Sequence, residues 1–190
     1  MTGRWQMMVA LSLCVALFSA NWTALYVAQQ AISRDLHLTS AAGVWLIYLY
    51  PAALLAVLIP VKGRLSVLLL GLGAFCLASF GAALAPNGAM LIGCRAGQGL
   101  AAAIALRAGF ELAREHFRGT EWGPALVLPV ALAVPALIAG PVIGGVITDY
   151  LSFRWVFLIN VPLTVVALVL VALFTPRRAP HPHPHPHPRA

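Results

Sequence analysis

The sequence predicts an all-α membrane protein, a polytopic transmembrane bundle of about six spanning helices. Hydrophobic residues make up 61% of the chain and charged residues 9%, against roughly 25% charged residues in soluble globular domains. Apolar runs of about 20 residues, each able to cross a hydrocarbon core of about 30 Å, recur along the chain. Such a chain has too few polar residues to cover itself with a water-facing surface.

Six apolar runs occupy most of the sequence, with short polar or turn-forming segments between them. Residues 29–41 form a polar connection, residues 62–65 form a basic turn, and Ala85-Pro86-Asn87-Gly88 has the residue types of a turn. The expected spans are approximately residues 5–28, 42–61, 66–84, 89–116, 124–147 and 155–174. We therefore expect residues 1–175 to form one six-helix transmembrane domain.

The net charge of +7 would suggest nucleic-acid binding in a soluble protein, but here the basic residues lie between the apolar runs. With the amino terminus inside, the outer side holds only Arg34 and Arg154. The inner side holds Arg4, Lys62, Arg64, Arg107, Arg114, Arg118, Arg177, Arg178 and Arg189. This positive-inside bias predicts a multi-pass protein of the plasma membrane with both termini cytoplasmic. Membrane lipid is then the expected partner, and nucleic acid is not.

The end of the chain, residues 176–190, alternates proline with His181, His183, His185 and His187. Proline at every second position forbids a helix and favours an extended chain. Histidines two apart do not share one face of a three-residue turn, so they favour at most weak metal binding. We expect a disordered cytoplasmic tail, no built metal site and no cofactor.

Arg95 is the most informative residue inside an apolar run. An arginine near a helix centre costs about 3 kcal/mol on insertion scales and usually faces the bundle interior or a watery cavity. Arg95 therefore either lines a transport path or proton relay, or it lies shallower and braces a neighbouring helix. Gln98 shares its face at i+3, and the pair Gly93 and Gly97 has the spacing of a close helix contact.

The fifth apolar run combines small residues with prolines. Ala136, Gly140 and Gly144 are spaced four apart, and Pro141 removes a backbone hydrogen bond. With Gly145, these residues predict a helix that packs tightly and bends.

Asn21, Trp22 and Tyr26 place a polar and aromatic patch in the first run. Facing inward, the patch would line a cavity together with Tyr48 or Tyr50. Facing outward, it would be an interfacial aromatic belt, and the sequence leaves both readings open. No pairing of nucleophile and base, metal-ligand cluster or phosphate loop is recognisable, so nothing favours an enzyme.

Three stretches together resemble a known family. They are Trp45 and Tyr50 followed by Pro60-x-x-Gly63-Arg64-Leu65, then Arg95-Ala96-Gly97-Gln98-Gly99, and finally Gly140-Pro141-x-x-Gly144-Gly145 with Phe153 to Pro162. Residues 4–175 resemble the amino-terminal six-helix half of the major facilitator superfamily, and within it the fourteen-helix drug:proton antiporters.

This resemblance implies a transporter that exports a small organic compound, with the proton as coupling ion. The implied substrate and proton path holds Arg95, Gln98, Asn21, Trp22 and Tyr50. The implied packing and gating motif holds Gly140, Pro141, Gly144 and Gly145. Gly63 and Arg64 would begin the first cytoplasmic signature loop.

Four departures from the family pattern bear on function. The signature loop normally continues with charged residues, whereas Ser66 leads straight into apolar residues. Asn21 stands where a helix 1 aspartate is usual, and Arg107 stands at an apolar or proline position. A six-helix chain would also need a homodimer or a complementary half in order to transport. The alternative is a truncated or degenerate half that serves as a non-transporting membrane module.

Overall fold

The computed structural model describes residues 3–60, 63–117 and 119–175, which form helices and turns without any strand. The helices are α1 (Gly3–Asp35), α2 (Ser40–Leu54) with η1 (Leu55–Leu58), α3 (Leu65–Ala83), α4 (Gly88–His116), η2 (Gly119–Glu121), α5 (Trp122–Tyr150), α6 (Arg154–Leu158) and α7 (Asn160–Phe174). Within the described residues, six segments are long and apolar enough to cross a membrane. The predicted all-α, six-span architecture is confirmed.

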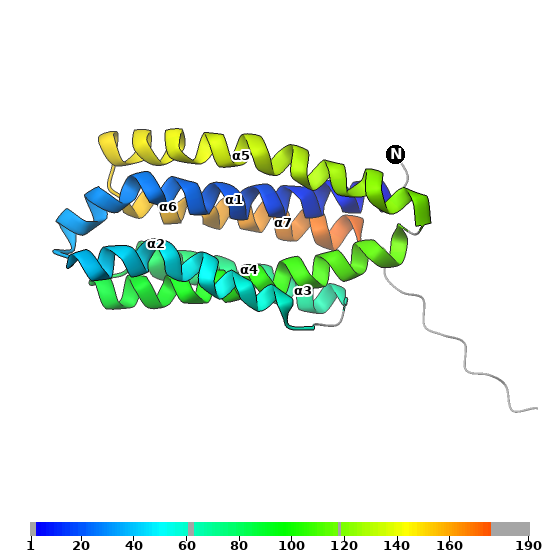
Figure 1. Ribbon diagram of the computed structural model, residues 1–190, viewed down its shortest axis with the longest axis horizontal. Helices are drawn as coiled ribbons and strands as arrows, with labels where there is room; N and C mark the ends of the chain where they lie inside the picture. Colours follow the sequence, from blue (N-terminus) through cyan, green and yellow to red (C-terminus); the bar gives the residue numbers. More distant parts are fainter. Residues whose placement is uncertain (1–2, 61–62, 118, 176–190) are drawn as a thin grey trace, which may run out of the picture.

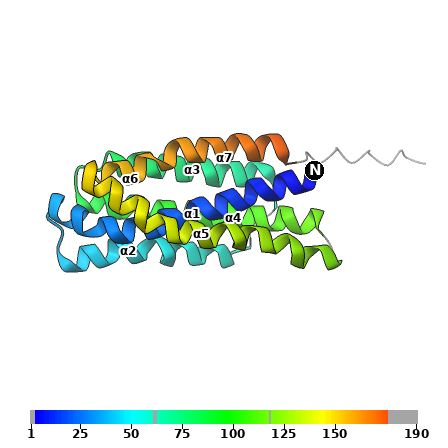
Figure 2. The ribbon, with the colours of Figure 1, turned by 90° about the horizontal axis from the view of Figure 1, so that it is seen from above.

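The helices run along a common axis and form one bundle (Figures 1 and 2). α1 packs along α5, α3 packs along α4 and α7, and α2 packs on α4. Aromatic packing supports the middle of the bundle, where the Phe18 and Phe75 ring centroids lie 4.8 Å apart. Both ends of the described chain lie at the same end of the bundle (Figure 1), as an even number of crossings requires.

α1 is longer than the sequence predicts, because residues 29–35 continue the helix that was expected to end near Ala28. Ala28 and Ile32, one helical turn apart, are both fully buried, so the apolar face of α1 continues past the polar residues. The chain then reverses through His37, which has a φ of 49°. The Thr39 side chain accepts a hydrogen bond from the Ala42 N–H and caps the start of α2.

The sixth span contains α6 and α7, which meet at Ile159 and together run over Arg154–Phe174 as one apolar segment long enough to cross a membrane. The backbone at Ile159 stays helical, with a φ of −62° and a ψ of −26°, so the predicted continuous span is confirmed. Pro162 has no N–H to donate to the carbonyl four residues before it. The Asn160 side chain donates to the Val156 carbonyl at 3.3 Å and lies inside the bundle at the start of α7.

Close helix contacts occur at glycines other than the predicted pair Gly93 and Gly97. A Cβ at Gly93 would meet nothing within 4 Å, and one at Gly97 would make an ordinary 3.7 Å contact with Ala78. The prediction of a close contact there is therefore wrong. On the same helix, a Cβ at Gly99 would lie 2.7 Å from the Ala53 Cβ. The glycine that brings α2 close to α4 is thus Gly99.

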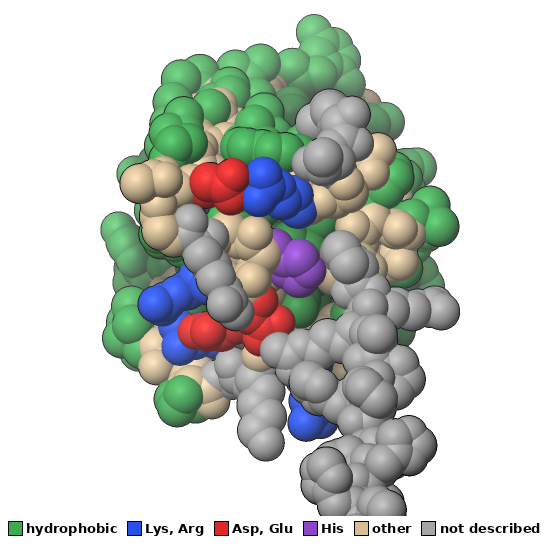
Figure 3. Space-filling model, turned by 90° about the vertical axis from the view of Figure 1, so that its right-hand side faces the viewer, with side chains coloured by type: hydrophobic (Ala, Val, Ile, Leu, Met, Phe, Trp, Pro, Cys, Tyr) green, Lys and Arg blue, Asp and Glu red, His purple; other side chains and the backbone are tan. Residues whose placement is uncertain are grey.

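Acidic and basic side chains gather at the end of the bundle that holds both described chain ends (Figure 3), and the ion pairs of Arg4 and Arg107 lie there. Arg4 makes two hydrogen bonds to the Glu121 carboxylate, at 2.6 and 2.9 Å, which join the start of α1 to η2. Arg107 pairs with Glu111 at 2.7 Å along α4. Arg64 and Arg114 are also described at this end. The other basic residues expected on this side, Lys62, Arg118, Arg177, Arg178 and Arg189, and the four tail histidines lie outside the described residues.

Candidate functional site: a buried polar seam

Six polar side chains from five helices lie in the interior, and each is at most 4% exposed. We call this group the polar seam. It consists of Asn21 on α1, Tyr50 on α2, Ser79 on α3, Arg95 and Gln98 on α4, and Asn160 on α7. In a bilayer, water cannot satisfy such groups, so their hydrogen bonds must come from each other or from a ligand.

Arg95 organises one part of the seam. Its Nη1 donates to Gln98 Oε1 at 2.7 Å, as the i+3 spacing predicts, and Gln98 Nε2 donates to Ser79 Oγ at 2.7 Å. The guanidinium carbon of Arg95 lies 4.5 Å from the centre of the Tyr50 ring. This cation–π contact joins α2 to α4. Arg95 is fully buried, so it does not snorkel to a surface of this bundle.

Asn160 and Asn21 form the other part of the seam. Asn160 Nδ2 donates to Asn21 Oδ1 at 2.7 Å and so ties the start of α7 to the middle of α1. The Tyr50 hydroxyl donates to the Phe18 carbonyl, one turn before Asn21, at 3.3 Å. Tyr50 therefore contacts both parts of the seam, with its ring on Arg95 and its hydroxyl on α1.

Replacing Asn160 with Leu should weaken the contact between α1 and α7, because Asn21 loses its hydrogen-bond donor. Hydrogen bonds between membrane helices contribute about 0.6 kcal/mol on average and up to about 1.7 kcal/mol. We expect a loss in this range in the unfolding free energy measured in detergent. Thr164→Val is the matched control, since the Thr164 hydroxyl bonds only to the Asn160 carbonyl within its own helix. Equal losses in the two variants would contradict an interhelical role for Asn160.

Three buried donors of the seam have no hydrogen-bond partner. They are Arg95 Nε, Arg95 Nη2 and Asn21 Nδ2. The chain has five acidic residues, and all five are described near helix ends: Asp35, Glu111, Glu115, Glu121 and Asp149. No carboxylate of this chain therefore neutralises Arg95, and the seam has spare donors around an uncompensated positive charge.

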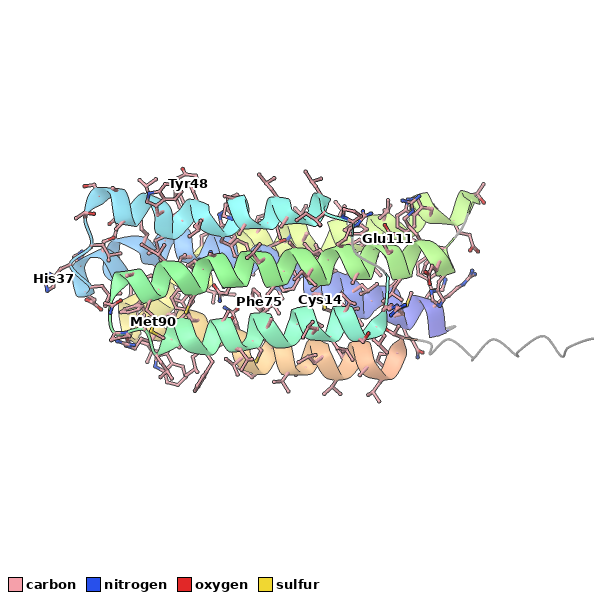
Figure 4. All side chains as sticks on the ribbon, turned by 90° about the horizontal axis from the view of Figure 1, so that it is seen from below. Cys14, His37, Tyr48, Phe75, Met90 and Glu111 are labelled. Carbon is pink, nitrogen blue, oxygen red and sulfur yellow. The ribbon has the colours of Figure 1, made fainter. Side chains whose placement is uncertain are left out.

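The structure brings together four of the five residues expected on the polar path. Trp22 is the exception: it is 38% exposed and lies outside the seam. Successive residues of a helix point about 100° apart, so Asn21 and Trp22 cannot both face the same neighbour. Tyr26 and Tyr48 are 63% and 55% exposed, and Tyr48 points away from the bundle (Figure 4). Of the two tyrosines considered for the cavity, only Tyr50 is buried.

Sequence reasoning did not single out Ser79 or Asn160. A lone serine in an apolar run carries no signal, because a serine can bond within its own helix. Asn160, in contrast, carries a signal in the sequence that could have identified it. It is a polar residue with four hydrogen-bonding valences inside an apolar segment, two residues before a proline.

Gly140 and Gly144 of the predicted packing motif lie directly against the α1 backbone. A Cβ at Gly140 would lie 2.7 Å from the Ala20 carbonyl oxygen, and one at Gly144 would lie 2.9 Å from the Ala24 Cα. A Cβ at Gly145, in contrast, would make an ordinary 3.6 Å contact with a Val27 methyl group. Pro141 is half-buried beside these glycines. Two of the four motif residues therefore set the distance between α1 and α5.

Gly63 lies against the charged carboxyl-terminal end of α4. A Cβ there would lie 2.6 Å from the Glu111 Cβ and 3.1 Å from the Leu112 nitrogen. Arg64 follows at the N-cap of α3. The start of the predicted signature loop thus packs directly on α4, although its usual charged continuation is missing from the sequence.

Comparison with known proteins agrees with this architecture. A sequence profile described as Major Facilitator Superfamily matches residues 11–190. The chain is 34% identical over 176 residues to a lincomycin resistance protein of Streptomyces lincolnensis, covering 90% of this chain and 36% of the relative. It is 34% identical over 173 residues to the probable multidrug resistance protein EmrY of Escherichia coli, covering 87% of this chain and 34% of the relative.

A third relative is the multidrug efflux pump LfrA of Mycolicibacterium smegmatis. It is 29% identical over 190 residues, with 95% of this chain and 36% of the relative covered. The chain spans about a third of the length of the curated relatives it matches. With a matching profile over most of the chain, six spanning helices and a buried arginine on the fourth span, the protein belongs to the Major Facilitator Superfamily.

Proposed function

We propose that this chain forms one six-helix unit of an efflux transporter for a small organic compound, with the polar seam lining the transport path. The observation that carries the proposal is Arg95, which is fully buried, hydrogen-bonded to Gln98 through Nη1 only, and covered by the Tyr50 ring of α2. An intramembrane charge of this kind marks a substrate or ion pathway by default. Relatives described as resistance proteins and efflux pumps support export as the direction.

A second six-helix unit, either a second copy or a complementary half, completes the proposed transporter. Transporters of this architecture hold substrate between two halves that rock against each other. α5 supports this step, because only four of its 29 residues are buried, against twelve of 33 in α1. Six of its exposed large side chains recur every three or four residues and form one stripe: Val127, Val130, Val134, Ile138, Val142 and Val146.

The proposed location is the plasma membrane, with both described chain ends on the cytoplasmic side and the proton as coupling ion. The charge distribution supports this orientation. Arg4, Arg64, Arg107 and Arg114 belong to the end that holds the chain ends, whereas Arg34 and Arg154 belong to the opposite end. His37 and Glu111, at opposite ends in Figure 4, mark the two sides.

Efflux from vesicles tests the proposal. Purified chain is reconstituted into lipid vesicles loaded with a fluorescent organic compound, and export is followed with and without an imposed pH gradient. We expect gradient-dependent export that falls at least about tenfold in Arg95→Ala, because the path loses its only buried charge. Arg107→Ala, which removes the same charge from the end of the same helix, should retain export. Unchanged export in Arg95→Ala would remove the role assigned to this residue.

The second candidate function is a non-transporting membrane module. The observation that favours it is the absence of any carboxylate from the seam of this chain, since proton coupling needs a group that titrates. Crosslinking followed by mass measurement in detergent separates the two candidates. A strict monomer that exports nothing from vesicles would support the module, and a dimer that exports would exclude it.

A further inference from the structure

The seam differs from an ordinary buried polar cluster in its balance of donors and acceptors. Every unpartnered buried atom in it is a donor: Arg95 Nε, Arg95 Nη2 and Asn21 Nδ2. Buried donors without partners are costly, and a buried charge without a counter-charge is more costly still. The seam thus has an excess of hydrogen-bond donors and of positive charge. It is complementary to a group that supplies hydrogen-bond acceptors and a negative charge.

We infer that the polar seam binds an organic anion, whose carboxylate or similar oxyanion accepts hydrogen bonds from the unpartnered Nε and Nη2 edge of Arg95. This inference rests on the proposed transport function and narrows its substrate class to organic anions. A guanidinium presents Nε–H and one Nη–H as a planar fork that matches the two oxygens of a carboxylate. The Nη1 group is already committed to Gln98, so the free groups are those of this fork.

A comparison with two other arginines shows that the missing carboxylate partner is particular to Arg95. Arg107, three turns further along the same helix, has its own carboxylate partner in Glu111 at 2.7 Å. Arg4 likewise has Glu121. Arg95 is the most buried of these arginines and is the one without a carboxylate.

A second copy of this chain cannot supply the missing carboxylate at this depth. All five acidic residues of the chain lie in η2 or in the last two turns of a helix. Arg95 lies seven residues into α4, about 10 Å from its start. The anion must therefore come from a small molecule or from an acidic side chain outside these 190 residues, and the purified chain alone distinguishes these sources.

Tyr50 is the side chain that an incoming anion would displace. Its ring covers the Arg95 guanidinium at 4.5 Å, and it immediately precedes Pro51 inside α2. Pro51 removes one backbone hydrogen bond from the turn that carries Tyr50, and α2 continues as a 3-10 segment from Leu55. The side chain that covers Arg95 thus belongs to a turn of α2 that has lost a backbone hydrogen bond.

The test measures thermal stabilisation of the purified full chain in detergent by benzoate, with benzamide as the neutral probe of the same shape. Ionic hydrogen bonds are about twice as strong as neutral ones, so we expect benzoate to bind at least about tenfold more tightly than benzamide. Arg95→Gln should abolish this preference, and Arg107→Gln, with the same change of charge, should keep it.

Asn21→Asp gives a further check that keeps Arg95 in place. Its carboxylate would neutralise the seam from within and should weaken benzoate binding at least about tenfold.

Equal stabilisation by benzoate and benzamide, or a preference that survives in Arg95→Gln or in Asn21→Asp, would overturn the inference. So would the absence of stabilisation by benzoate, because the free carboxylate would then not enter the seam. These outcomes are independent of transport. Export of neutral or cationic compounds without benzoate binding would keep the proposed function and reject the anion. Benzoate binding without export would keep the anion site and reject the proposed transport function.

Discussion

Gly144→Ala should destabilise the bundle by about 1–3 kcal/mol, the usual cost of an overpacked contact. The added methyl group would meet the Ala24 carbonyl group and Cα, which belong to the backbone of α1. A flexible side chain could move aside, but a helix backbone moves only as a whole, so α1 and α5 would have to separate along their longest contact. The measurement is the unfolding free energy of the purified chain in detergent.

Gly145→Ala is the matched control for this prediction. The two glycines are neighbours in one helix, and each substitution exchanges the same residue types. Alanine is favoured over glycine in a helix by about 0.5–1 kcal/mol, and a Cβ at Gly145 makes only an ordinary contact with Val27. Gly145→Ala should therefore be neutral or mildly stabilising. A Gly144→Ala variant as stable as Gly145→Ala would show that α1 and α5 do not approach each other at Gly144.

The double variant Arg95→Met with Gln98→Met should be more stable than the original chain and should fail to transport. A charge at a helix centre costs about 3 kcal/mol to insert. The contact of Arg95 with the Tyr50 ring returns about 1 kcal/mol, and its bond to Gln98 returns about 0.6 kcal/mol. The sum leaves Arg95 destabilising by about 1 kcal/mol. Gln98 is replaced as well because its Oε1 would otherwise lose the donor it now accepts from.

Unfolding in detergent and export from vesicles are measured on the same preparations. Arg107→Met serves as the control, and it should lose stability slightly because Glu111 is left without its partner. A double variant less stable than the original chain would contradict the account, because the Arg95 network would then be a structural brace. Stabilisation with loss of export is the outcome expected of a charge retained for function.

Properties that depend on long stretches of sequence were predictable. The six spans follow from apolar runs and turn residues, and burial of Arg95 follows from the cost of its charge in lipid. Gln98 was assigned to the same face from its i+3 spacing, and the structure shows the hydrogen bond at 2.7 Å. Such inferences concern one helix at a time, where geometry is fixed by the helical repeat.

Properties that depend on two helices were not predictable to the same extent. The spacing of Gly93 and Gly97 is as suitable for a close contact as that of Gly140 and Gly144, but only the second pair faces a neighbouring backbone. Likewise, Trp22 is next to Asn21 in the sequence, but it is 38% exposed whereas Asn21 is buried, because α1 turns it away from Asn160 and Tyr50. The hydrogen bond between Asn160 and Asn21 also joins two helices that are far apart in the sequence, and no spacing within one helix predicts it.

The most direct test of the polar seam is crosslinking of Asn21→Cys to Asn160→Cys by a short bifunctional methanethiosulfonate, in a chain whose native Cys14, Cys76 and Cys94 are replaced with Ser. Asn160 Nδ2 and Asn21 Oδ1 lie 2.7 Å apart, which leaves the two Cβ atoms farther apart than a direct disulfide allows. A reagent that bridges two thiols should therefore join cysteines at these positions rapidly in membranes. The pair Trp22→Cys with Asn160→Cys, shifted by one residue on α1, should not crosslink. The reverse pattern, or equal crosslinking of the two pairs, would show that α1 does not present Asn21 to α7 and that the seam is not assembled as described.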